Sequence, residues 1–131
     1  MNTALVVDDD DSFREMLALA FRVEGFEVHA AQHGRAALDI LKTQRNVNVL
    51  VTDITMPVMD GFELIRATRK AFPHIPIIAI TAGGAHYTAF DSLKVSEALG
   101  ACATLQKPFN LDELFTAVRN ALAGNQEPRE G

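Results

Sequence analysis

The sequence predicts an α/β domain, doubly wound around a five-stranded parallel sheet. Short, almost wholly apolar runs alternate along the chain with longer segments that have helical periodicity. Strands that are apolar on both faces are typical of parallel sheets, because the crossover helices cover both sides. Right-handed crossovers allow few strand orders, and we expect 2-1-3-4-5. The 131 residues, 48% of them apolar, are enough for one domain with a single core.

The first half of the chain supplies three of the strands and two helices. Ser12 and Glu15 have the spacing of a capping box, which predicts that the first helix begins there and ends at Gly25. Apolar, β-branched runs predict the strands, and 3.6-residue periodicity predicts the second helix. We expect strands at 4–7, 26–30 and 47–52, and the second helix at 35–42.

The second half supplies two strands and three helices, punctuated by glycine and proline. Asn110 and Glu113 are positioned to cap the last helix, which is expected to end at Ala123. Cys102 falls in the last apolar run and is expected to be buried. We expect helices at 62–72, 89–99 and 111–123, strands at 77–80 and 102–105, a domain over 1–124 and a frayed tail at 125–131.

Composition excludes several classes of partner. Lys and Arg number 12 against 17 Asp and Glu, and the net charge of −5 argues against binding nucleic acid or an acidic membrane surface. No apolar run approaches the roughly 18 residues of a membrane span, and the N-terminus has no signal-peptide pattern. The single cysteine cannot form an internal disulfide. We therefore expect a cytoplasmic protein.

Polar side chains follow four of the five predicted strands. Asp8 and Asp9 come after the first, Asp53 after the third, Thr81 after the fourth and Lys107 just past the fifth. In open parallel sheets, ligands bind at the carboxyl ends of the strands, where the strand order reverses. If the first and third strands are neighbours, the three carboxylates converge in one pocket.

Three converging carboxylates require a compensating positive charge. At ~4 Å and an effective dielectric of ~20, each like-charge pair costs about 4 kcal/mol before screening. Oxygen ligands favour Mg²⁺, for which Mn²⁺ could substitute. We expect Asp9 and Asp53 to be direct ligands, Asp8 to act through water, and the backbone carbonyl of Thr55 to be a further ligand.

A cation at this position would make Asp53 a workable nucleophile toward phosphorus, giving an acyl phosphate. Lys107 could pair with the phosphoryl oxygens, and the hydroxyl of Thr81 could donate to one of them. Ala82 is small and would leave the pocket open to a phosphoryl donor.

Four motifs at successive strand ends, LVVDDD, VTDITMPVMDG, IIAITA and LQKPF, resemble the response-regulator receiver domain of two-component signalling. The resemblance extends from about Ala4 to Ala123 and implies a flavodoxin-like receiver fold with five helices. It implies that Asp53 is the phospho-acceptor, that Asp8 and Asp9 are the acidic pair for Mg²⁺, and that Thr81 and Lys107 contact the phosphoryl group. It also implies a cis Lys107–Pro108 bond.

The sequence departs from the family pattern in three respects. Family members commonly carry Tyr or Phe three residues before the lysine, where this chain has Thr104, so the usual switch is in doubt. The stretch between Thr81 and Gly100 is longer than usual, and Thr55 and Gly83 offer no carboxylate or amide at positions linked to dephosphorylation rate.

Three hypotheses for the function remain. The first is a stand-alone receiver, monomeric or weakly dimeric, which takes a phosphoryl group from a sensor histidine kinase or phosphotransfer protein. It would signal to an unknown downstream protein through the fourth helix, fifth strand and fifth helix, over Tyr87–Arg119. The alternative is a degenerate receiver that acts as a phosphorylation-independent scaffold. The third, an aspartyl-phosphate hydrolase, requires an acid where Thr55 stands, so we expect no separate substrate turnover.

Overall fold

The computed structural model describes residues 2–54, 61–81 and 100–126. A five-stranded parallel sheet of order β2-β1-β3-β4-β5 forms its centre, as predicted. The strands are β1 (Thr3–Val7), β2 (Glu27–Ala31), β3 (Val49–Asp53), β4 (Ile77–Thr81) and β5 (Ala103–Gln106). Val7 of β1 pairs with Thr52 of β3, so the residues that follow them, Asp8 and Asp53, emerge side by side.

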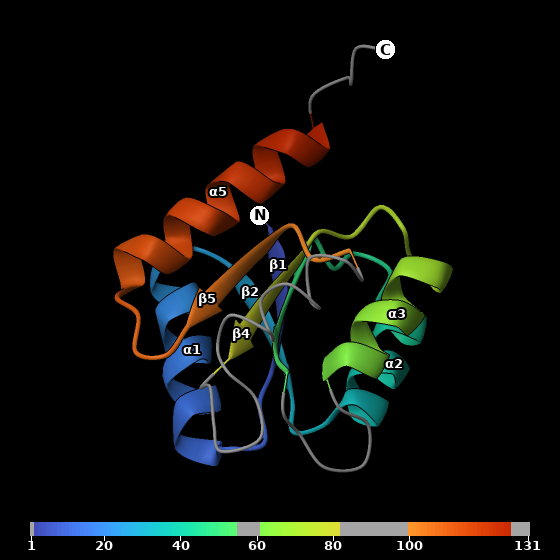
Figure 1. Cartoon of the computed structure of the whole chain (residues 1–131), viewed down its shortest axis with the longest axis horizontal. Helices are drawn as coiled ribbons and strands as arrows, with labels where there is room; N and C mark the ends of the chain where they lie inside the picture. Colours follow the sequence, from blue (N-terminus) through green and yellow to red (C-terminus); the bar gives the residue numbers. More distant parts are fainter. Residues whose placement is uncertain (1, 55–60, 82–99, 127–131) are drawn as a thin grey trace.

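The helices form two layers around this sheet (Figure 1): α1 (Asp11–Val23) and α5 (Leu111–Gln126) cover one face, and α2 (Gly34–Thr43) and α3 (Gly61–Ala71) cover the other. Successive residues of β1 alternate between the two cores. Leu5 packs with Leu41 and Leu64 on the α2 and α3 side, whereas Val6 packs with Leu17 and Leu114 on the α1 and α5 side. The helix expected at 89–99 lies outside the described residues.

The first helix begins earlier than the capping-box prediction placed it. Asp10 has an extended backbone and its carboxylate accepts a hydrogen bond from the amide of Phe13 at 3.1 Å, so Asp10 is the N-cap. Ser12 already lies inside the helix and cannot cap it. The capping box at the last helix is confirmed. The side-chain oxygen of Asn110 accepts a hydrogen bond from the amide of Glu113 at 2.8 Å, and the amide of Asn110 donates to the carboxylate of Glu113 at 3.5 Å. That helix continues to Gln126, past the expected end.

The prediction for Cys102 was wrong, because this side chain is exposed. It precedes β5, an edge strand whose residues are only partly buried, and an edge strand has a neighbour on one side alone. In the part of the chain that the structure describes, no helix has the length and apolar character needed to cross a membrane.

The backbone that leads into β5 is anchored by Arg69 of α3. Its guanidinium donates hydrogen bonds to the carbonyl oxygens of Gly100 at 3.0 Å, Pro73 at 2.6 Å and Ile75 at 3.1 Å. Gly100 has φ of +113°, and a Cβ at this position would lie 2.9 Å from the side chain of Arg69. Arg69 therefore holds both the entry to β4, which ends at Thr81, and the entry to β5, which ends just before Lys107.

Candidate functional site

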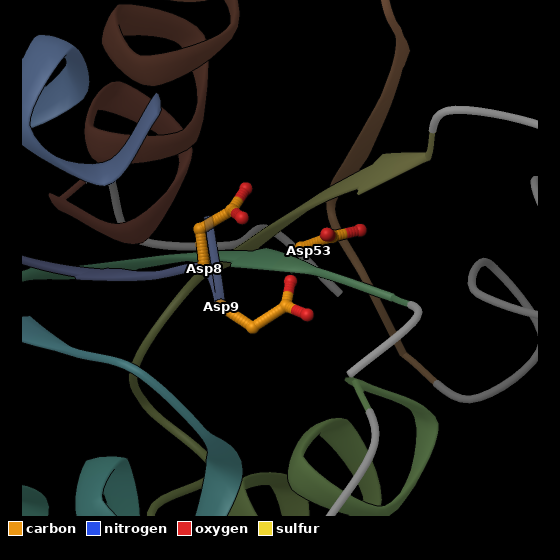
Figure 2. A group of neighbouring side chains, drawn as sticks. All are labelled: Asp8, Asp9 and Asp53. Atoms are coloured by element: carbon orange, nitrogen blue, oxygen red, sulfur yellow. The ribbon is translucent and has the colours of Figure 1, made fainter. Parts of the chain in front are cut away.

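The three predicted carboxylates meet at the carboxyl end of the sheet. One carboxylate oxygen from each of Asp8, Asp9 and Asp53 lies within 4.8 Å of the other two. Figure 2 shows the three side chains gathered together. The side chains of Asp8 and Asp53 are 1% and 9% exposed, whereas Asp9 faces solvent. The pocket is therefore closed on the sheet side by two buried carboxylates and open to solvent beside Asp9.

Asp8 is held by contacts on several sides. Its Oδ1 atom accepts a hydrogen bond from the amide of Asp10 at 2.9 Å, and its backbone carbonyl accepts from Arg14 at 2.8 Å. Burial raises the pKa of Asp8 above its usual value, and the Asp10 amide and the Lys107 ammonium oppose this effect only in part. The ionised form of Asp8 is therefore disfavoured until another positive charge arrives.

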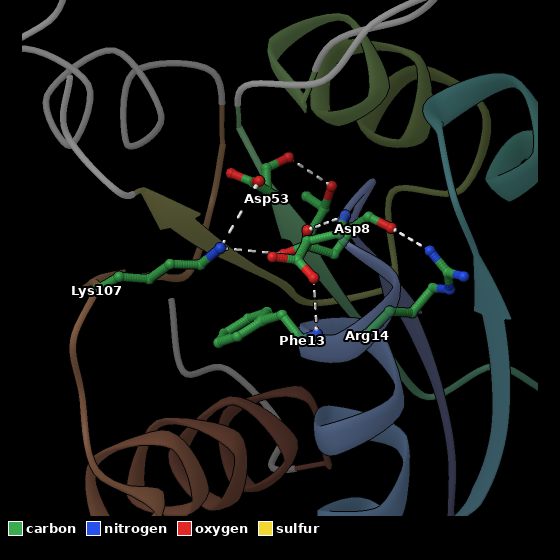
Figure 3. Close-up of polar contacts among 7 residues, drawn as sticks. Asp8, Phe13, Arg14, Asp53 and Lys107 are labelled. Carbon is green, nitrogen blue, oxygen red and sulfur yellow. Dashed lines mark hydrogen bonds and ion pairs between the residues drawn. The ribbon is translucent and has the colours of Figure 1, made fainter. Parts of the chain in front are cut away.

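Lys107 brings a positive charge from the end of β5. Its Nζ atom lies 3.3 Å from Oδ2 of Asp8 and 3.9 Å from Oδ2 of Asp53. Figure 3 shows the side chain reaching across the ends of the strands into the space beside both carboxylates. The backbone of Lys107 is fixed to β4 by a hydrogen bond from its amide to the carbonyl of Thr81 at 2.7 Å. The Lys107–Pro108 bond is cis, as the resemblance implied.

The remaining predicted residues fall into three groups. Thr81 is buried at the end of β4, one residue beyond Ile80, which pairs with Asp53. Thr104 lies within β5, where it pairs with Ala79 and is half-buried. Thr55, the expected carbonyl ligand, and Ala82 lie outside the described residues. The structure thus brings together Asp8, Asp9, Asp53 and Lys107 by measured distances, and Thr81 reaches the same edge through its strand.

The sequence and the fold both match a known family. The family model for the response regulator receiver domain matches residues 4–119. The chain belongs to this family.

Relatives of this receiver domain differ in length. This chain is 34% identical over 118 residues to sporulation initiation phosphotransferase F of Bacillus subtilis, and the match covers 90% of this chain and 91% of that protein. It is 39% identical over 122 residues to the regulatory protein AtoC of Escherichia coli, covering 93% of this chain but 25% of that protein. The chain spans from about a quarter to about half of the length of the first curated relatives that it matches.

Solved structures agree with the fold. A response regulator receiver domain protein from Clostridium thermocellum superposes with a TM-score of 0.89 at 26% identity, covering 96% of this chain and 98% of that one. The chemotaxis protein CheY4 of Vibrio cholerae gives a TM-score of 0.82 at 33% identity, covering 93% and 99%. Receiver domains of response regulators are phosphorylated on an aspartate and bind Mg²⁺ at an acidic pocket.

The acidic pocket of this receiver domain fits Mg²⁺. Hard divalent cations take carboxylate and carbonyl oxygens and keep several waters, and here the open side next to Asp9 leaves room for water. Burial raises the pKa of Asp8, and the Asp10 amide and the Lys107 ammonium compensate its negative charge only in part. Bound Mg²⁺ would offset this charge and withdraw electron density from phosphoryl oxygens.

Sequence reasoning missed the contribution of the first turn of α1. Phe13 was not singled out from the sequence, yet its ring centroid lies 3.9 Å from Nζ of Lys107. Arg14, which binds the carbonyl of Asp8, was not singled out. The nearest signal in the sequence is the N-cap, but Ser12 and Asp10 both suit that position, and only the structure shows that Asp10 caps α1, which places residues 13 and 14 in its first turn.

Proposed function

We propose that this receiver domain accepts a phosphoryl group on Asp53, in a Mg²⁺-dependent reaction, from a histidine kinase or a histidine phosphotransfer protein in the cytoplasm. One observation carries the proposal: Nζ of Lys107 lies beside Oδ2 of both Asp8 and Asp53, at 3.3 and 3.9 Å, next to a cluster of three carboxylates. An ammonium and a cation pocket on either side of one carboxylate are what a transferred phosphoryl group needs, because its charge is spread over three oxygens.

Asp53 is the acceptor best supported by the geometry. It ends β3, between β1 and β4 in the sheet, so groups from both neighbours reach it. Asp8 is less suitable, because its side chain is only 1% exposed and its Oδ1 is held by the Asp10 amide. An oxygen of Asp53 would attack phosphorus, the bond from phosphorus to the donor's imidazole nitrogen would break, and the acyl phosphate would remain on Asp53.

The roles of the other residues follow from their positions. Asp8, Asp9 and Asp53 would hold Mg²⁺ or Mn²⁺, Asp8 through water, with the carbonyl of Thr55 as a further ligand. Lys107 would contact the phosphoryl oxygens, and the Thr81 hydroxyl, at the end of β4, would donate to one of them. The domain assists its own phosphorylation and turns over no separate substrate.

An apolar groove supports a protein as the phosphoryl donor. Met16, Leu19 and Val23 of α1 and Leu111 of α5 are the exposed large apolar residues of the described ranges, and all four border this groove. Phe13, three residues before Met16 on α1, contacts Lys107, so the same helix borders both the groove and the acidic pocket. A protein surface docked on α1 would thus present its phosphohistidine close to Asp53.

Output would use another surface. We place it on Tyr87–Arg119, of which residues 100–119, including β5 and the first part of α5, are described. The receiver would act there on a downstream protein as a monomer or weak dimer. A hollow of about 680 Å³ between these two elements, lined by Ala103, Asn110, Ala117 and Ala121, is compatible with a docked segment. We propose that the functional unit is the domain over 1–124, acting alone.

A phosphorylation-independent scaffold is the second candidate, and Thr104 is the observation that favours it. A small residue stands in β5 where family members commonly carry an aromatic one. Under this hypothesis the pocket would be retained without use.

Incubation with Mg²⁺ and acetyl phosphate, followed by intact-protein mass spectrometry, tests the proposal. We expect the mass to increase by one phosphoryl group, and Asp53→Asn or chelation of Mg²⁺ to abolish the increase. Asp39→Asn, an exposed aspartate of α2, is the matched control and should behave as the wild type. No mass gain in the wild-type domain would favour the scaffold, and an equal gain in Asp53→Asn would place the acceptor elsewhere.

A further inference from the structure

The ammonium group of Lys107 lies against an aromatic ring as well as against two carboxylates. Its Nζ atom is 3.9 Å from the ring centroid of Phe13, which lies below it in Figure 3. The ring of Phe13 is contacted in turn by Phe109, with centroids 6.0 Å apart and planes at 88°, an edge-to-face arrangement. Lys107 and Phe109 flank Pro108, so one short segment supplies both the cation and the support for the ring.

The backbone fixes Phe13 relative to the acidic pocket. Its amide donates to the carboxylate of Asp10, and the amide of Asp10 donates to the carboxylate of Asp8. Arg14, the next residue, binds the carbonyl of Asp8 at 2.8 Å. The first turn of α1 and the end of β1 therefore form one hydrogen-bonded unit, which fixes the backbone from which the ring of Phe13 projects.

The ring provides an attraction that a divalent cation does not weaken. Lysine has a flexible stem, and fixing it costs rotamer entropy. Its two carboxylate partners are also the groups that would bind Mg²⁺, and a cation there would reduce their attraction for Nζ. The face of a neutral ring attracts an ammonium through its quadrupole and has no comparable affinity for a hydrated Mg²⁺.

We propose that Phe13 is a positioning residue for Lys107: its ring keeps the ammonium over the pocket when Asp8 and Asp53 are engaged by a cation, ready to meet the incoming phosphoryl oxygens. The proposal rests on the phosphorylation of Asp53 proposed above. Phe13 itself touches no reacting atom, and it acts through Lys107.

Two variants and a control test this role. Phe13→Leu keeps an apolar side chain but removes the ring face, and Phe13→Tyr restores the ring. Phe26→Leu is the control, because Phe26 also packs edge-on against a ring, Phe21 at 5.0 Å, but lies beyond the other end of α1. Circular dichroism and thermal unfolding establish that each variant is folded.

The first measurement is independent of phosphorylation. A ring current shifts protons above an aromatic face upfield, so the Cε protons of Lys107 should resonate upfield of those of the exposed Lys42 and Lys70 in NMR spectra. We expect this shift to persist with Mg²⁺ added, to vanish in Phe13→Leu, and to return in Phe13→Tyr. Lys107 protons that coincide with those of Lys42, with or without Mg²⁺, would overturn the proposal.

The second measurement is the rate of phosphorylation by acetyl phosphate at saturating Mg²⁺. We expect Phe13→Leu to lower the rate constant roughly three- to tenfold at saturating donor, and Phe13→Tyr and Phe26→Leu to remain near the wild type. A wild-type rate in Phe13→Leu, or an equal loss in Phe26→Leu, would overturn the positioning role. A wild-type domain that accepts no phosphoryl group would instead overturn the proposed function, while the NMR result would still report whether the contact exists.

Discussion

The Nζ atom of Lys107 lies 3.3 Å from Oδ2 of Asp8, although 99 positions separate the two residues along the chain. The contact joins the end of β5, an edge strand, to the end of β1. Two strands, β4 and β3, lie between them in the sheet. The same Nζ atom lies 3.9 Å from Oδ2 of Asp53. One ammonium thus neutralises part of the charge that a divalent cation would otherwise neutralise, and the two positive charges compete for the same carboxylates.

This competition gives the first prediction. Lys107→Met removes the ammonium but keeps an apolar stem, and we expect Mg²⁺ to bind roughly three- to tenfold more tightly, because repulsion between two cations disappears. Isothermal titration calorimetry measures the change. Lys70→Met, at an exposed lysine of α3, is the control and should leave the affinity unaltered. Weaker Mg²⁺ binding in Lys107→Met would show that the lysine organises the pocket more than it competes.

Asp8→Asn tests the cost of the buried carboxylate. Because burial raises the pKa of Asp8, its ionised form is destabilising without a metal, and the neutral amide should raise the free energy of unfolding in EDTA by about 1 kcal/mol. In Mg²⁺ the order should reverse, because the cation stabilises the wild type more than a variant with one ligand fewer. Urea unfolding followed by circular dichroism measures both. A less stable variant in EDTA would contradict this account.

The same carboxylate predicts a pH dependence. A raised pKa means that folded Asp8 binds its proton more tightly than unfolded Asp8, so the contribution of Asp8 to the stability of the metal-free protein falls as pH rises from the unfolded value of 3.8 through the folded pKa. Above the folded pKa the contribution is constant. The unfolding free energy of the wild type should therefore fall relative to that of Asp8→Asn as pH rises across this interval. A difference that stays flat from acid to neutral pH would contradict the raised pKa.

Patterns that repeat along the chain predicted the fold. Leu5 and Val6 show why: neighbouring residues of one strand enter opposite cores, so each central strand must be apolar throughout, and such runs are visible in the sequence. The site was predictable for the same reason, since polar residues at the carboxyl ends of strands share one edge of the sheet. Asp8, Asp9, Asp53 and Lys107 could therefore be named together.

Contacts that depend on exact helix starts and on sheet edges were not predictable. Ser12 and Asp10 both suit an N-cap, and only the geometry shows that Asp10 caps α1 and thereby brings Phe13 against Lys107. Cys102 resembles a core residue because its neighbours are apolar, but the exposure of an edge strand depends on what covers it. The local sequence shows the hydrophobic periodicity of a helix or strand, but it does not show which distant residues will contact that element.

The apolar groove predicts that a substitution on α1 slows phosphoryl transfer from a protein donor but not from a small-molecule donor. Leu19 is 62% exposed, so Leu19→Gln should leave the fold and the rate with acetyl phosphate unchanged. Transfer from a phosphorylated histidine-containing protein should slow about tenfold, because a buried apolar contact of the docked complex is lost. Parallel rate measurements with the two donors check this. Equal rates of protein transfer in the wild type and the variant would remove α1 from the docking surface.

A pair of glycines separates backbone strain from steric conflict. Gly25 and Gly100 both have positive φ, +92° and +113°, but a Cβ at Gly25 has no atom within 4 Å, whereas one at Gly100 would meet Arg69 at 2.9 Å. We expect Gly25→Ala to cost about 1 kcal/mol of unfolding free energy through strain alone. Gly100→Ala should cost about 2 kcal/mol or more, because displacing Arg69 also breaks its hydrogen bonds to the carbonyls of Gly100, Pro73 and Ile75. A double-mutant cycle tests whether the steric conflict is with Arg69. Arg69→Ala removes the obstacle, and in this background Gly100→Ala should cost no more unfolding free energy than Gly25→Ala.

Urea unfolding of all the variants measures these differences. A Gly100→Ala penalty that is unchanged by Arg69→Ala would mean that the guanidinium does not set the path into β5.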